Sequence, residues 1–259
     1  MSARIDRLWP EPEQDLDDER LLAHYAVPTE RRWLRMNFVT SIDGAATREG
    51  KSGGLGDAAD RRVFELLRRH AHAVLVAAGT VRIEGYDAMR LDEEAAAWRA
   101  AHGLASQPAF AIVTRSLDLD PESDVFSDAP VRPVVYTVAA APAERRAALA
   151  AVADVVDAGE RDVEPARVLD DLAARGHTHV HSEGGPSLFG SFIAADVVDE
   201  LCLTVAPSLE SGDARRIATG PEAAPQRMRL AAVLRASDEL LLRYVRDRED
   251  GRGAEVPGH

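Results

Sequence analysis

The stretch from His181 to Phe192, "HSEGGPSLFGSF", sets two glycines and a proline between an alternating run, "HTHVHSE", and apolar residues at helical spacing. This order predicts a strand, a tight turn and a helix that begins at the turn. In an open α/β sheet, such a helix start presents unpaired N–H groups beyond the carboxyl ends of the strands. We expect Gly184 and Gly185 to let a pyrophosphate reach the backbone; the alternative is that they only make the turn.

Strand and helix patterns alternate along the rest of the chain. Strand patterns cover 32–41, 72–80, 109–116, 133–138, 198–207, 228–237 and 239–247, and helix patterns cover 57–70 and 164–176. Asp57 is suited to cap the first helix, and Pro165 suits the first turn of the second. The alternation predicts an α/β domain with a mostly parallel central sheet, and the consecutive last strands predict an antiparallel C-terminal edge.

Composition limits the function. The 259 residues include 44 acidic and 31 basic side chains, a formal charge of −13, which argues against nonspecific binding to nucleic acid or anionic membrane. The single cysteine, Cys202, excludes an internal disulfide and is expected to be an inert core thiol. The histidines at 70, 72, 177, 179 and 181 alternate too loosely for a zinc site, so we expect no metal.

The ends of the chain differ from its middle. Residues 1–28 are polar and charged, with no apolar segment typical of a signal peptide, and we expect an N-terminal extension that contains a short helix at 18–28. Residues 29–247 are expected to form the folded domain, and 248–259 a disordered tail with too little apolar surface to order itself. We expect a cytoplasmic protein without a membrane partner.

Three segments together resemble a known family: "SIDGAAT" at 41–47, "LLRRHAHAVLVAAGTV" at 66–81 and "SEGGPSLFGSFIAADVVDELCLTVAP" at 182–207. The family is the reductase domain of riboflavin biosynthesis, the C-terminal half of the bifunctional deaminase-reductase. One cysteine cannot build the zinc deaminase site of that enzyme, so the chain resembles the stand-alone pyrimidine reductase homologues of actinobacteria. The resemblance implies a dihydrofolate-reductase-like three-layer fold.

The resemblance also implies NADPH as cofactor and hydride transfer to C1′ of a ribosylamino-pyrimidine 5′-phosphate. Carried over position by position, the cofactor residues are Thr40, Ser41, Gly79, Thr80, Glu84, Gly184, Gly185, Pro186, Ser187 and Leu188. Thr80 has an alternative role as a helix cap. The end of the strand pattern at 109–116 adds Thr114, Arg115 and Ser116, because a guanidinium and hydroxyls without a carboxylate suit a 2′-phosphate.

The substrate residues implied in the same way are Ser52, Arg68, Arg90 and Glu183. Arg68 has an equally plain alternative as a surface ion pair. Asp43 and Glu183 are the candidate catalytic carboxylates for the proton, with water as the alternative, and Asp43 before Gly44 is also ordinary turn chemistry. Family members pair through their late strands, and the apolar content of 198–207 and 239–247 predicts a homodimer.

Departures from the family pattern leave other functions open. The family usually has Val-Gly-x-Gly-Thr where this chain has Ala77-Ala78-Gly79-Thr80 after Val76, and "RIEGYDAMR" at 82–90 lacks the usual Asp-x-Pro loop. A dihydrofolate-reductase activity on a pterin and a non-catalytic NADPH-binding homologue therefore remain alternatives. Another Rossmann-like enzyme, such as a methyltransferase, is disfavoured because no acidic ribose-binding residue follows the second strand.

Overall fold

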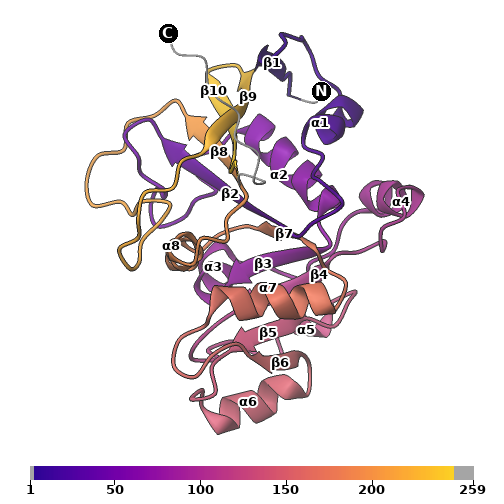
Figure 1. Ribbon diagram of the computed structural model, residues 1–259, viewed down its shortest axis with the longest axis vertical. Coiled ribbons are helices and arrows are strands. Elements are labelled where there is room, and N and C mark those ends of the chain that lie inside the picture. The colour runs from indigo at the N-terminus through magenta and orange to yellow at the C-terminus, as the bar shows by residue number, and fades with distance from the viewer. Residues whose placement is uncertain (1–2, 248–259) are drawn as a thin grey trace.

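Ten strands form one mixed sheet in the computed structural model, which describes residues 3–247 (Figure 1). Their order across the sheet is β1-β9-β10-β8-β2-β7-β3-β4-β5-β6. The strands are β1 (Asp6–Trp9), β2 (Trp33–Ser41), β3 (Ala73–Ala77), β4 (Ala109–Val113), β5 (Val134–Thr137), β6 (Asp154–Asp157), β7 (His179–Ser182), β8 (Glu200–Ala206), β9 (Arg229–Ala236) and β10 (Glu239–Val245). The strands from β8 to β6 pair in parallel, and β10, β9 and β1 add an antiparallel edge. The predicted sheet is confirmed.

Helices cover both faces of this sheet. They are α1 (Asp18–His24), α2 (Ala58–His70), α3 (Ala78–Glu84), α4 (Glu93–Ala101), α5 (Asp124–Ser127), α6 (Ala143–Ala150), α7 (Pro165–Ala174) and α8 (Pro186–Ala194). Leu75 of β3 packs in the core under α7 and α8, whereas its neighbour Val74 packs in the core with α3, α5 and α6. Successive strand residues point to opposite faces, so the molecule has the three layers that were expected.

The helix ends follow the sequence signals. The Asp57 carboxylate accepts from the backbone N–H of Ala59 at 2.6 Å, and Pro165 lies in the first turn of α7. Gly176 follows the end of α7 with a φ of +88°. Cys202 is a buried free thiol, as expected. The elements β1, β6, α4, α5 and α6 were not predicted.

The residues before Pro28 pack into the same core as the rest. β1 pairs with β9, the predicted short helix is α1, and Ile5 and Leu21 are fully buried. A buried ion-pair network adds to this attachment: Glu200 holds Arg35 and Arg243, which donate to the backbone oxygens of Tyr25 and His24. The segment predicted as an extension is therefore part of the folded unit, and the predicted tail, 248–259, lies outside the described residues.

The sheet opens at its carboxyl end between β2 and β7. The parallel pairing of these strands ends at Met36 and Ser182, while β2 continues beside β8 as far as Ser41. The residues after Ser182 are those of the Gly-Gly-Pro turn, so this turn faces the unpaired part of β2. Within residues 3–247, no helix is both long and apolar enough to cross a membrane.

Candidate active site

A cavity of about 370 Å³ fills this opening, and we call it the β2 cavity. Its walls come from β2, the loop before α2, α2 itself, α3 and the turn before α8. The residues that line it include Asn37, Phe38, Ser52, Gly56, Asp57, Asp60, Arg61, Phe64, Arg68, Thr80, Glu84, Tyr86, Asp87, Glu183, Gly184, Gly185 and Pro186. The structure thus brings Ser52, Arg68 and Glu183, predicted as substrate residues, together with Thr80 and Glu84, predicted as cofactor residues.

Arg68 and Glu183 form the central ion pair of the β2 cavity. Arg68 Nη2 lies 2.7 Å from Glu183 Oε2, and the Tyr86 hydroxyl donates to the same oxygen at 2.8 Å. The guanidinium also lies 4.5 Å from the centroid of the Phe64 ring. Burial opposes ionisation of Glu183, but the Arg68 guanidinium outweighs it and holds the pKa of this carboxyl below its usual range. Glu183 is therefore a fixed anion that orients Arg68 and Tyr86.

His181 lies behind this pair. Its Nε2 is 3.6 Å from Glu183 Oε1, and neither ring nitrogen has a hydrogen-bond partner among the described residues. Burial lowers the pKa of His181 to about 4. The ring is therefore neutral near pH 7.

Two further polar side chains complete the wall. The Ser52 hydroxyl and backbone N–H both donate to Glu84 Oε1, at 2.9 and 2.8 Å. Glu84 thus joins the loop before α2 to α3. Asn37 of β2 also lines the cavity and adds an amide side chain to its wall. Sequence reasoning missed Asn37, because a lone asparagine inside a strand pattern gives no signal of its position at the end of a cleft.

Thr40 and Ser41 end β2 and Asp43 lies in the turn after it, and none of the three lines the β2 cavity. The Asp43 carboxylate accepts from the Ser41 hydroxyl and from the backbone N–H of Ser211 at 2.8 Å, and Ser41 Oγ accepts from the N–H of Ala45 at 2.9 Å. The hydrogen bond from Ser41, supported by the backbone donors, lowers the pKa of Asp43 to about 2. This geometry matches the turn alternative for Asp43.

The backbone conformation and packing of the turn before α8 require glycine at both of its glycine positions. Gly184 and Gly185 have φ of +107° and +99°, and a Cβ on Gly185 would lie 2.5 Å from the Cβ of Ala77. Gly185 is also the N-cap of α8 and contributes no side-chain hydrogen bond. The glycines therefore make the turn and let α8 approach β3. The first N–H groups of α8 after Pro186, those of Ser187 and Leu188, have no partner within the helix, so they can still bind an anion.

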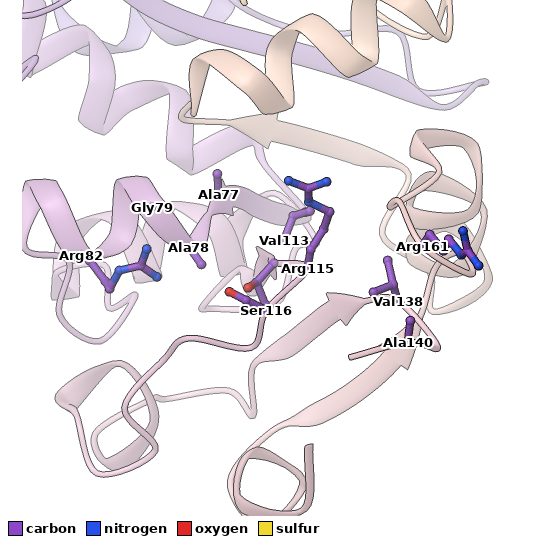
Figure 2. A pocket seen from close by; sticks show the side chains of 11 residues that line it. Ala77, Ala78, Gly79, Arg82, Val113, Arg115, Ser116, Val138, Ala140 and Arg161 are labelled. Carbon is purple, nitrogen blue, oxygen red and sulfur yellow. The ribbon is translucent and has the colours of Figure 1, made fainter. Parts of the chain in front are cut away.

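A second cavity of about 480 Å³ lies beside the first, at the ends of β3, β4 and β5, and we call it the β4 cavity (Figure 2). It is lined by Ala77, Ala78, Gly79, Arg82, Val113, Thr114, Arg115, Ser116, Val138, Ala140 and Arg161. Figure 2 shows Arg82 and Arg161 on opposite sides of Arg115 and Ser116. No Asp or Glu of the described residues lines this cavity, although Asp162 pairs with Arg115 at 2.9 Å outside it.

Gly79 lies in α3, and its surroundings differ from those of Gly185. A Cβ on Gly79 would meet nothing within 4 Å, so this glycine borders open space in the β4 cavity. Ala77 is the N-cap of α3, and Thr80 lies inside the helix, so the alternative of Thr80 as the cap is wrong. The Thr114 hydroxyl accepts from the N–H of Leu117 at 3.1 Å and stabilises a turn.

Arg90 lies at neither cavity. Its guanidinium donates to the backbone oxygen and the carboxylate of Asp128, at 2.8 and 3.0 Å, on the surface. The physical reason is the course of the chain: after Tyr86 the loop leads to α4, and Gln107 fixes it through the N–H of Leu91. The structure therefore does not place Arg90 with Ser52, Arg68 and Glu183, the other residues predicted to bind the substrate.

Comparison with known proteins gives consistent matches. The family model described as the RibD C-terminal domain matches residues 32–242. The 2,5-diamino-6-ribosylamino-4(3H)-pyrimidinone 5′-phosphate reductase of Methanothermobacter thermautotrophicus is 32% identical over 193 residues, which cover 73% of this chain and 85% of that protein. The riboflavin biosynthesis protein RibD of Bacillus amyloliquefaciens is 29% identical, and the match covers 70% of this chain and 49% of that protein.

The crystal structure of a pyrimidine reductase-like protein from Corynebacterium diphtheriae is similar at a TM-score of 0.78 and 28% identity, covering 87% of this chain and 97% of that one. Acinetobacter baumannii RibD shares the fold, at a TM-score of 0.64 and 20% identity over 84% of this chain and 58% of that one. With the family model spanning β2 to β10, the chain belongs to the family of the RibD C-terminal domain.

Proposed function

We propose that this protein is an NADPH-dependent reductase that transfers a hydride to C1′ of a ribosylamino-pyrimidine 5′-phosphate. The relative from Methanothermobacter thermautotrophicus carries the name of such a reductase. The single observation that carries the proposal is the pair of neighbouring cavities at the carboxyl end of the sheet, one lined by arginines and one by a buried ion pair. This arrangement suits a phosphorylated cofactor beside a polar acceptor.

The β4 cavity fits the phosphate-bearing half of NADPH. Arg115 and Arg161 with the Ser116 hydroxyl supply donors for a 2′-phosphate, and among residues 3–247 no carboxylate lines the cavity to accept from a free 2′-hydroxyl. Open space at Gly79 leaves room for the cofactor backbone. The free N–H groups of Ser187 and Leu188 at the start of α8 suit the pyrophosphate. NADPH supplies the hydride when bound, and the residues named here position it.

The β2 cavity fits the acceptor. Arg68, held by Glu183, presents a fixed guanidinium for the sugar phosphate, and Ser52 adds a hydroxyl on the same wall. A third hollow of about 580 Å³ shares Thr80, Glu84 and Pro186 with the β2 cavity and extends the space along the rim of the sheet. The chain therefore offers continuous room beside the turn before α8.

The pterin alternative has less support. Dihydrofolate needs a free carboxylate at its ring and a separate arginine for its glutamate tail. In this protein Glu183 and Arg68 bind each other, so they cannot serve two ends of a long ligand. This observation favours the pyrimidine.

The proposal includes a homodimer. Leu203, Val205, Val233, Leu240 and Leu242 share one face of β8, β9 and β10. The opposite face, with Cys202, Leu234 and Leu241, packs against α1 and α2, whereas this one is only partly buried. A second copy would cover it. Light scattering at micromolar concentration should give twice the chain mass, and a monomeric mass would contradict the dimer.

The experiment that tests the function is steady-state kinetics with NADPH and each of the two acceptors. We expect oxidation of NADPH with the ribosylamino-pyrimidine phosphate and little or none with dihydrofolate. Turnover of dihydrofolate alone would overturn the proposal, and turnover of neither would favour the non-catalytic homologue. The cytoplasmic location expected from the sequence stays a prediction.

A further inference from the structure

Reduction of a carbon–nitrogen double bond takes up a proton as well as a hydride. The two carboxyls predicted to supply this proton, Asp43 and Glu183, are poor proton donors at neutral pH. Hydrogen bonds from Ser41 and backbone N–H groups lower the pKa of Asp43 to about 2, and Asp43 does not line the β2 cavity. Glu183 is buried, yet Arg68 holds its pKa below the usual range. Both are ionised near pH 7 and have no proton to give.

A different carboxyl lies on the cavity wall. Asp60 is in the first turn of α2, and Phe64 and Arg68 line the same cavity one and two turns further along this helix. The loop before α2 crosses closely over it: a Cβ on Gly56 would lie 2.2 Å from Asp60 Oδ2. This close approach partly shields the carboxyl from solvent. Asp60 therefore borders the ligand space from a sheltered position.

Two acidic groups, one basic group and one hydroxyl face Asp60. Asp57 is the N-cap of α2, Arg61 lies on that helix, Thr204 faces Asp60 from β8, and Glu239 lies behind it on β10. Glu239 is 2% exposed, accepts from the backbone N–H of Asp57 at 3.0 Å through Oε1, and has no partner for Oε2 among the described residues. A negative charge on one of these carboxyls disfavours ionisation of its acidic neighbours.

The direction of the pKa shifts agrees with this geometry. Burial raises the pKa of Asp60, although the Thr204 hydroxyl opposes the shift. Burial, together with the neighbouring Asp57, raises the pKa of Glu239 to about 8. Both shifts favour the protonated carboxyl, and of the two residues Asp60 is the one that lines the β2 cavity.

We propose that Asp60 is the acid that delivers the proton to the substrate nitrogen in the β2 cavity, with Glu239 as the buried carboxyl that holds a proton behind it. The inference rests on the proposed function. The double bond gains a hydride at carbon from the dihydronicotinamide, which is oxidised, and the freed π electron pair of the reduced imine forms an N–H bond with the Asp60 proton. Asp60 is left as a carboxylate and regains a proton from solvent before the next turnover.

The test compares Asp60→Asn with Glu65→Gln, which removes an exposed carboxylate from the same helix. We expect Asp60→Asn to lower kcat about 100-fold or more, the usual contribution of a general acid, while KM for the pyrimidine phosphate and the NADPH dissociation constant stay within about threefold of wild type. Glu65→Gln should match wild type. In the wild type kcat should fall as pH rises through the pKa of Asp60, and this limb should be absent from Asp60→Asn.

A second variant and a second readout keep the test independent of folding. Asp60→Glu retains an acid one methylene away, so it should keep the pH limb at a reduced kcat. Carbon-13 NMR titration of the aspartate carboxyls in the ligand-free protein, with Asp60→Asn to assign the resonance, should give Asp60 a midpoint above the ordinary aspartate value of about 3.9.

The outcomes separate the two proposals. If the wild type does not turn over the pyrimidine phosphate, the proposed function fails and the role of Asp60 fails with it. If the wild type is active and Asp60→Asn has the kcat and pH profile of Glu65→Gln, only the role of Asp60 is overturned. An ordinary midpoint for the Asp60 resonance would also overturn it.

Discussion

The β4 and β2 cavities lie side by side at the carboxyl end of one sheet, yet their linings have opposite charge. The β4 cavity is lined by Arg82, Arg115 and Arg161 and by no carboxylate of the described residues. The β2 cavity is lined by two arginines and by the carboxylates of Asp57, Asp60, Glu84, Asp87 and Glu183. The first is suited to the phosphates of a cofactor, and the second combines the Arg68 guanidinium proposed for the sugar phosphate with carboxyls suited to proton transfer. The same fold thus places cofactor recognition and proton chemistry in neighbouring cavities.

The largest expected effect is on the β2 side, where a charge is buried. Arg68→Ala leaves Glu183, whose side chain is fully buried, without its cation. Breaking a buried pair in this way costs about 3–5 kcal/mol of unfolding free energy, which urea unfolding measures. The double variant Arg68→Ala with Glu183→Gln should recover most of the stability without recovering substrate affinity. If the double variant also bound substrate normally, Arg68 would have only a structural role.

The next effect distinguishes Gly185, in the turn before α8, from Gly79 in α3. Gly185→Val places a side chain against Ala77 at a φ of +99°, and overpacking together with backbone strain should cost about 3 kcal/mol or more. Gly79→Ala adds a methyl group in open space, so thermal unfolding should change by about 1 kcal/mol or less while NADPH binding weakens. Equal losses of stability in both variants would contradict the distinction.

A smaller effect tests the cationic side. Arg115→Asp should weaken NADPH by about 1.5–3 kcal/mol, the value of a charge-assisted hydrogen bond, and should change NADH affinity much less. Isothermal titration with both cofactors measures this difference. Arg90→Asp is the matched control, because Arg90 lines neither cavity and pairs with Asp128 on the surface. Wild-type protein that binds both cofactors equally would refute a 2′-phosphate site in the β4 cavity.

The smallest effect concerns pH. Burial lowers the pKa of His181 from 6.5 to about 4, so between these values the unfolded chain binds a proton that the folded protein does not. The contribution of His181 to stability is therefore complete above pH 6.5 and is lost as pH falls toward 4. His181→Leu should reduce the loss of unfolding free energy across this range, measured by urea titration at several pH values. An unchanged pH dependence would mean that other histidines account for it.

Sequence reasoning identified the fold from the elements with strong periodicity. The helix 57–70 and the strands 32–41 and 109–116 form where their patterns predict, because long apolar runs and caps such as Asp57 are local signals. β6 was missed because "DVVD" is too short and too charged to give a strand pattern, and it forms only by pairing with β5. β1 likewise depends on β9, far along the chain.

The candidate site was predicted as a set of residues rather than as an arrangement. The sequence singled out Arg68 and Glu183 separately, but their mutual ion pair depends on how α2 crosses the end of β7. The sequence could not show that Ala77 leaves no room for a side chain at Gly185, because the two residues are far apart in the chain and meet only in the folded protein. Asp60 gave no signal among the charged residues of α2. Its position became apparent only with Gly56 above it and Glu239 behind it.

The pairing of β1 with β9 has a consequence for self-association. β9 has eight residues, and without β1 its outer row of N–H and C=O groups would be a template for another chain. β1 ends the sheet with only four residues, an irregular register after Arg7, and an ion pair between Asp6 and Arg235 at 3.2 Å. A segment that lies outside the family-matched region, 32–242, thus protects the protein against open-ended polymerisation through its sheet.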